Sequence, residues 1–190
     1  MLFVRHASTP GMRAARFPAD EPADASSLAK VAAVAGSKAW VAPSRAALQT
    51  AVAMGLEPVT TPALAEADCG RWRGLAYEQV AREEPDALAS WLSDPHAAPH
   101  GGESLAALAA RVAGWLEEVR SQAGRLDETR SQPPGVVVCD AGAIRAALGH
   151  VLGLGPVAAA RFDLAPLSTT ELTVTRGGWR VAHVNRKVLF

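Results

Sequence analysis

Three short polar segments of the sequence carry residue types that could bind and transfer a phosphoryl group. They are Arg5-His6, Ser44-Arg45 and the stretch from Asp140 to Arg145, and each follows a run of apolar residues. Guanidinium groups form paired hydrogen bonds with phosphate oxygens, the N–H groups that open a helix attract anions, and an imidazole can accept a phosphoryl group. Together the three segments predict an anion site with a nucleophile beside it.

The apolar runs before these segments predict the strands that position them. Residues 2–4, 39–42 and 136–139 are continuous apolar stretches bounded by turn formers, and residues 59–60 indicate a further short strand. Strands that alternate with helices predict an α/β fold, a three-layer α/β/α sandwich with a mostly parallel central sheet. Such a sheet binds ligands beyond the carboxyl ends of its strands, which is where the polar segments lie.

The helices and connections follow from periodicity, capping and turn residues. We expect helices over residues 28–35, over 45–54 with Ser44 as the N-cap, near Tyr77 and Asp86, from Leu105 to Val119, and after Asp140. Residues 13–27 and 66–74 are predicted as ordered loops, and residues 121–135 as a surface connection. Alternating residues on both sides of Gly177-Gly178 predict a β-hairpin near the C-terminus.

Composition narrows the class of protein. Nineteen Lys and Arg balance nineteen Asp and Glu in 190 residues, 49% of which are apolar, so we expect one globular domain over residues 1–190 with no nucleic-acid or membrane partner. No apolar run could span a bilayer or form a signal peptide, which favours a cytoplasmic protein. Two cysteines are too few for a disulfide framework. Whether the chain is a monomer or a homodimer stays open.

The order of the motifs resembles the histidine phosphatase superfamily, the phosphoglycerate mutase-like group, over nearly the whole chain. The matching segments are Val4-Arg5-His6-Ala7-Ser8-Thr9, Pro43-Ser44-Arg45 with Gln49-Thr50-Ala51, Leu64-Ala65-Glu66 with Gly70, Trp72 and Gly74, Gly101-Gly102-Glu103-Ser104, and Val138 to Arg145. The tail, from Ala165 to Thr170 and from Trp179 to Asn185, is most similar to α-ribazole phosphatase-like members.

The resemblance implies a phosphoglycerate mutase-like fold and a phosphatase that acts on a small phosphorylated metabolite without a metal or another cofactor. It implies that His6 is the nucleophile and passes through a phosphohistidine, and that Glu66 protonates the leaving alkoxide. Arg5, Arg45, Asp140 and Ala141 are then expected to contact the phosphoryl group. Two guanidiniums beside a neutral imidazole supply the charge stabilisation and positioning that phosphoryl transfer needs.

Asp140 departs from the family pattern, because it stands five residues before Arg145, where the family has its second histidine. An ionised carboxylate offers only hydrogen-bond acceptors and repels the phosphate, whereas the histidine donates to it. We therefore expect weakened activity. The alternative is a phosphate-ligand binding or regulatory protein with impaired catalysis.

A minor alternative uses the same segment differently. Cys139 to Arg145 also fits the C-x-x-G-x-x-R phosphate loop of cysteine-dependent phosphatases. In that interpretation the Cys139 thiolate attacks phosphorus, with Arg145 and the helix N-terminus as its support. It leaves Arg5, His6 and Arg45 without a role.

Overall fold

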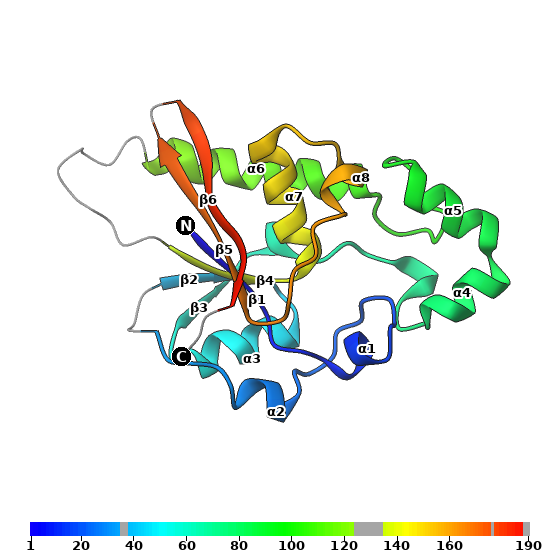
Figure 1. Cartoon of the computed structure of the whole chain (residues 1–190), viewed down its shortest axis with the longest axis horizontal. Helices are drawn as coiled ribbons and strands as arrows, with labels where there is room; N and C mark the ends of the chain where they lie inside the picture. The colour runs from blue at the N-terminus through cyan, green and yellow to red at the C-terminus, as the bar shows by residue number, and fades with distance from the viewer. Residues whose placement is uncertain (35–37, 124–134, 176, 188–190) are drawn as a thin grey trace.

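The central feature of the protein is a mixed β-sheet (Figure 1). The computed structural model describes residues 1–34, 38–123, 135–175 and 177–187. Within these ranges the strands follow the order β3-β2-β4-β1-β5-β6. Their bounds are β1 Leu2–Arg5, β2 Lys38–Val41, β3 Glu57–Thr60, β4 Val136–Cys139, β5 Ser168–Thr175 and β6 Gly178–Lys187. Neighbouring strands among β1 to β4 are parallel and β5 and β6 are antiparallel, which confirms the mostly parallel sheet.

The register of β1 against β4 sets the geometry of the site. Arg5 pairs with Cys139, and the backbone N–H of His6 donates to the Cys139 carbonyl at 3.1 Å. Because both strands run in the same direction and end together, His6 and Asp140 leave the sheet side by side at its carboxyl edge.

Helices cover both faces of the sheet, with α6 and α7 on one face and α2 and α3 on the other (Figure 1). The helix pair α4 and α5 extends away from the sheet, on the side of its carboxyl edge. The helix bounds are α1 Pro10–Arg13, α2 Ala25–Leu28, α3 Arg45–Ala53, α4 Tyr77–Glu83, α5 Pro85–Ser93, α6 Leu105–Ala123, α7 Ala141–Leu152 and α8 Pro156–Ala159, with 3-10 turns η1 Pro62–Leu64 and η2 Gly70–Trp72. This arrangement is the expected three-layer sandwich.

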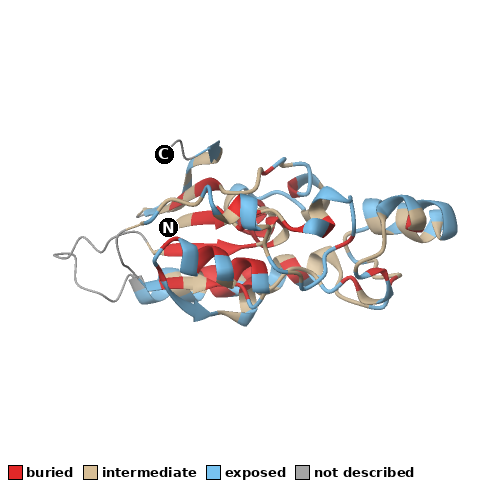
Figure 2. Ribbon diagram, turned by 90° about the horizontal axis from the view of Figure 1, so that it is seen from below, coloured by how far each residue is buried: buried red, intermediate tan, exposed pale blue. Residues whose placement is uncertain are grey.

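Two clusters of buried side chains hold these elements together. Figure 2 shows the buried residues concentrated in the strands and in the helix faces that lie on them. The larger cluster, which we call the main core, lies between the sheet and its helices. In it, Trp115 of α6 packs edge-on against Phe3 of β1 and Trp40 of β2. A smaller cluster of Phe17, Cys69, Trp72 and Val80 anchors α4 and the loop before it. The fully buried Trp72 therefore serves packing.

Two sequence-based expectations need correction. The helix expected over residues 28–35 is wrong for its described part, because α2 ends at Leu28. A short turn follows it, and the N–H of Val34 donates to the Met54 carbonyl after α3, which draws the chain out of a helical path. The segment 13–27, expected as a loop, contains most of α2. Most of the connection predicted over 121–135 lies outside the described residues, as does Arg176.

None of the helices in the described ranges is long and apolar enough to span a membrane.

Candidate active site

The carboxyl edge of the sheet opens into a cavity of about 460 Å³. Arg5 and His6 from the end of β1, Asp140 and Ala141 from the end of β4, and Glu66 from the loop after η1 all line this cavity. Residues that are far apart in the sequence thus meet where the predicted anion site requires them.

His6 is the central residue of the cavity and is 4% exposed. Its Nδ1 atom lies 2.7 Å from the backbone carbonyl oxygen of Ala7, and its Nε2 atom lies 2.9 Å from Oδ1 of Asp140. A carbonyl and an ionised carboxylate can only accept, so both ring nitrogens donate and the imidazole carries its second proton. Burial lowers the pKa of His6, but the Asp140 carboxylate outweighs burial and raises that pKa above its ordinary value.

Asp140 stands at the N-cap of α7, yet its side chain makes no capping bond. It binds His6 through Oδ1, and its Oδ2 accepts a hydrogen bond from the Ser44 hydroxyl at 3.2 Å. Burial alone would raise the pKa of the carboxyl group, but the adjacent His6 dominates and the pKa lies below its ordinary value. In the free protein the two residues therefore form a buried ion pair.

Ser44 occupies the N-cap position of α3, as expected, but its side chain does not cap that helix. The N–H of Arg45 instead donates to Oδ1 of Asp20 at 2.8 Å. The hydroxyl of Ser44 is thereby available to Asp140. The predicted N-cap position of Ser44 is confirmed, while Asp20 from a distant loop accepts the first N–H of the helix.

Arg5 carries a hydrogen-bond donor that is suited to an anion. Its guanidinium donates to the Leu164 carbonyl, whereas its Nε is buried and has no hydrogen-bond partner among the described residues. Burial, followed by the neighbouring Arg145, lowers the pKa of Arg5. An unpaired buried donor on a cation is unfavourable, so an anionic oxygen brought into the cavity would be stabilised there.

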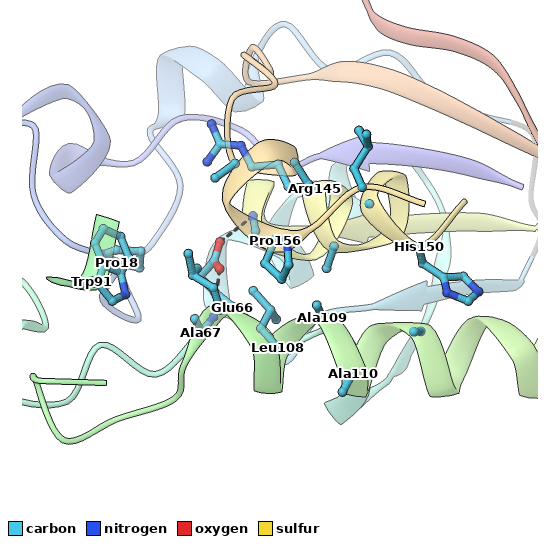
Figure 3. Close-up of a pocket in the computed structure, with 18 of the residues that line it drawn as sticks. Pro18, Glu66, Ala67, Trp91, Leu108, Ala109, Ala110, Arg145, His150 and Pro156 are labelled. Carbon is cyan, nitrogen blue, oxygen red and sulfur yellow. Dashed lines mark hydrogen bonds between the residues drawn. The ribbon is translucent and has the colours of Figure 1, made fainter. Parts of the chain in front are cut away.

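Glu66 faces the start of α7 (Figure 3). Its carboxylate accepts the N–H of Gly142 at 2.8 Å and the N–H of its neighbour Ala67 at 2.9 Å. Burial and then the Asp140 carboxylate raise the pKa of Glu66, which favours the protonated form that a general acid needs. Gly142 is required at this contact, because a Cβ there would lie 1.8 Å from Oε1 of Glu66.

The loop that carries Glu66 is fixed by Arg111 of α6, a residue that the sequence motifs do not indicate. Arg111 Nη1 donates to the carbonyls of Ala63 at 2.9 Å and Ala65 at 3.1 Å, and its Nη2 forms an ion pair with Glu103 at 2.6 Å. Glu103 precedes α6 and Arg111 lies within it, so no i,i+3 or i,i+4 spacing pairs the two residues and the sequence carried no local signal for this contact.

The basic residues around the cavity differ in part from those expected. Arg145 lines it, as do Arg13 and Arg16 of the segment after β1, which the sequence analysis had not assigned to the site. The position of Arg13 and Arg16 in the segment that follows β1 was the sequence feature that could have assigned them to the site. Arg45 is exposed and lies outside the residues that line the cavity, so its role toward phosphate stays a prediction.

Cys139 is unsuited to act as a nucleophile. It belongs to the central strand β4, is fully buried, and is part of the main core. Burial, together with the nearby Asp140 and Glu66, raises the pKa of the thiol well above its ordinary value, so the thiolate does not form readily. The interpretation as a cysteine-dependent phosphatase is therefore rejected.

In the described part of the chain, no three His, Cys, Asp or Glu side chains gather in a group that could hold a metal ion.

Comparison with known proteins relates the chain to one superfamily and to two phosphatases. The model of the histidine phosphatase superfamily (branch 1) matches residues 1–187. Phosphoserine phosphatase 1 of Hydrogenobacter thermophilus is 40% identical over 77 residues, which cover 40% of this chain and only 36% of that protein. Glucosyl-3-phosphoglycerate phosphatase of Mycolicibacterium vanbaalenii is 30% identical over 167 residues, which cover 81% of this chain and 74% of that protein.

The expected likeness to α-ribazole phosphatases is present in the fold. The solved structure of the α-ribazole phosphatase of Shigella flexneri superimposes with a TM-score of 0.79 and covers all of this chain and 98% of that one. The sequences are 15% identical, so this match concerns the architecture alone.

Proposed function

The chain belongs to branch 1 of the histidine phosphatase superfamily, and we propose that it hydrolyses the phosphate monoester of a small metabolite through a phosphohistidine on His6. The observation that carries the proposal is the convergence of His6, Arg5, Asp140, Arg145 and Glu66 on one cavity at the carboxyl edge of the sheet. The names of the relatives, which are phosphatases of small phosphorylated compounds, agree with this class of substrate.

The positive charge of the site binds the phosphoryl group. Arg5, with its unpaired buried Nε, and Arg145 hold the non-bridging oxygens, assisted by the N–H of Ala141 at the start of α7. Arg45 is proposed as a further ligand, on the basis of the family pattern. Because guanidinium groups compensate the charge of the transition state, we propose that the reaction needs no metal ion.

The reaction then proceeds in two steps. In the first, Nε2 of His6 attacks phosphorus, the bond between phosphorus and the leaving oxygen breaks, and Glu66 gives its proton to that oxygen. In the second, water attacks phosphorus while the Glu66 carboxylate takes a proton from the water. The bond between Nε2 and phosphorus breaks, and His6 and protonated Glu66 are restored with release of inorganic phosphate.

Asp140 must change its protonation state before His6 can react. The proton on Nε2 blocks the lone pair that attacks phosphorus, and Asp140 is the acceptor 2.9 Å away. A phosphate dianion repels the Asp140 carboxylate and attracts the His6 imidazolium, and we propose that the repulsion moves the proton from Nε2 to Asp140. Protonated Asp140 can then donate to a phosphoryl oxygen. Giving up the ion pair opposes this step, so we expect weaker activity than a histidine at position 140 would allow.

A second candidate function follows from the same contact. If the ion pair between His6 and Asp140 persists when phosphate is bound, the protein binds phosphate esters without turning them over. Such a chain would be a binding or regulatory protein.

The two functions are separated by trapping the intermediate. The protein is mixed with a 32P-labelled aryl phosphate in the presence of EDTA and denatured after a short interval. The proposal predicts a labelled protein that is acid-labile and alkali-stable, and loss of both label and turnover in His6→Ala. Binding of the ester by calorimetry without label or turnover, in the wild type and in Asp140→His, favours the binding protein.

A further inference from the structure

A second cavity, of about 380 Å³, continues from the catalytic cavity. The two share Pro18, Glu66, Tyr77 and Arg145 as lining residues. Figure 3 shows Glu66 between Pro18 and Trp91 on one side and His150 on the other, with α6 along one wall. The volume of this second cavity lies within the range of small-molecule sites, about 300–1,000 Å³.

The walls of this second cavity, which we call the apolar groove, are made mainly of small apolar residues. They come from three helices, namely Leu108, Ala109 and Ala113 of α6, Ala146 and Gly149 of α7, and Ala159 of α8. The Cβ of Ala159 would lie 3.1 Å from a Cβ at Gly149, so α8 packs closely on α7 at this point. The small side chains of the three helices form the wall of the groove.

Most polar side chains of the groove are engaged, apart from Trp91, whose buried Nε1 has no hydrogen-bond partner among the described residues. Arg145 donates through Nε to the Phe162 carbonyl at 2.9 Å, and its terminal N–H groups are those proposed to bind the phosphoryl group. His150 pairs with Glu117 at 2.8 Å. Leu92 and Leu154, which also line the groove, are 57% and 40% exposed. Exposed leucines beside a concave apolar wall favour an apolar occupant.

Glu66 connects this groove to the chemistry. As the proposed general acid, it must lie within hydrogen-bond distance of the leaving oxygen, and it borders both cavities. The carbon atoms attached to that oxygen therefore begin at the entrance of the groove. We infer that the groove binds the leaving group, and that the substrate is a phosphate monoester of a mainly aliphatic or aromatic alcohol. This inference rests on the proposed function and adds the class of substrate to it.

The test uses straight-chain alkylphosphonates from ethyl to octyl, whose P–C bond is not hydrolysed, so that binding is measured without turnover. Their affinities are determined by calorimetry at pH 5.5. If the groove binds the alkyl chain, affinity rises with each methylene group by up to about fourfold, until the groove is filled.

Substitutions inside and outside the groove test whether the alkyl chain binds there. Ala109→Phe fills the groove, so the rise of affinity with chain length should flatten, and Ala113→Leu should act in the same direction without the bulk of a ring. Ala107 lies two residues earlier on the same helix, is exposed and does not line the groove, so Ala107→Phe should keep the wild-type dependence.

The outcomes separate this inference from the proposed function. Phosphonates that bind equally well at every chain length would overturn the groove as the leaving-group site and leave the phosphatase proposal intact. Failure of the wild type to bind any phosphonate would contradict the anion site, and the inference with it. If light scattering shows that Ala109→Phe disrupts a dimer, the groove is a contact between copies and the inference is wrong.

Discussion

Nε2 of His6 lies 2.9 Å from Oδ1 of Asp140, and this short contact joins the ends of two neighbouring parallel strands. Asp140, the residue that departs from the family pattern, is therefore hydrogen-bonded to Nε2 of His6, the atom that must attack phosphorus. The imidazole is therefore held in position and also held in its protonated, unreactive form. The same contact explains why the pKa values of the two groups move apart.

The ion pair should make the stability of the protein depend on pH in a defined window. The pKa of His6 is raised from 6.5, so its contribution is present below pH 6.5 and is lost as the pH rises through the folded-state value. The pKa of Asp140 is lowered from 3.8, so its contribution is present above pH 3.8 and is lost as the pH falls through the folded-state value.

Asp140→Asn should therefore lower the free energy of unfolding by about 1 kcal/mol between about pH 4 and 6.5, since a neutral hydrogen bond replaces a charged one. Urea unfolding across pH measures the difference from wild type. We expect the difference to shrink at more alkaline pH, and a difference that grows there would contradict the ion pair.

Glu66→Gln should distinguish leaving groups. An alkyl leaving group needs a proton, so the value of kcat/KM for an alkyl phosphate should fall by about 10²- to 10⁴-fold. A 4-nitrophenolate leaving group needs little protonation, so the loss with 4-nitrophenyl phosphate should be much smaller. Both substrates are compared in an Asp140→His background, which we expect to be the more active. Equal losses with both substrates would show that Glu66 is not the acid.

Gly142→Ala should reproduce the defect of Glu66→Gln without removing the carboxyl group. The added Cβ would lie 1.8 Å from Oε1 of Glu66 and would displace it from the cavity. Gly114→Ala in α6 is the matched control, because a Cβ there meets nothing within 4 Å. It should raise the free energy of unfolding by about 0.5–1 kcal/mol and leave the preference for leaving groups unchanged. Wild-type kinetics in Gly142→Ala would contradict the position of Glu66.

Cys139→Ala should retain turnover, because the buried thiol takes no part in the reaction. Its core position predicts a lower free energy of unfolding, by about 1–2 kcal/mol, from the lost packing. In the native protein, iodoacetamide should label neither Cys139 nor the buried Cys69, whose pKa is raised to about 12 by burial. Loss of the phosphoenzyme in Cys139→Ala would restore the cysteine mechanism.

The sheet and its polar edge could be predicted from the sequence because they rest on local signals. Continuous apolar runs define β1, β2 and β4, and turn formers after them mark the edge where the site lies. His6, Glu66 and Asp140 come together as the motif order implied. The helix expected over residues 28–35 was wrong because a distant bond from Val34 to Met54, which no local pattern reveals, redirects the chain.

The hydrogen-bond partners of the side chains at the site could not be predicted from local sequence signals. Ser44 has the residue type and position of an N-cap, but Asp20 takes over the capping and leaves the hydroxyl to Asp140. The clamp of Arg111 on the loop of Glu66 joins residues 46 positions apart. Such contacts depend on how the layers pack, which a single sequence does not encode at short range.

We propose that Asp140 lowers the activity of a histidine phosphatase site. The decisive measurement is kcat/KM for 4-nitrophenyl phosphate in EDTA, from pH 5 to 9, for the wild type and Asp140→His. Replacing a repelling carboxylate by a hydrogen-bond donor should raise kcat/KM by about 10²-fold. Equal or lower activity in Asp140→His would contradict the claim.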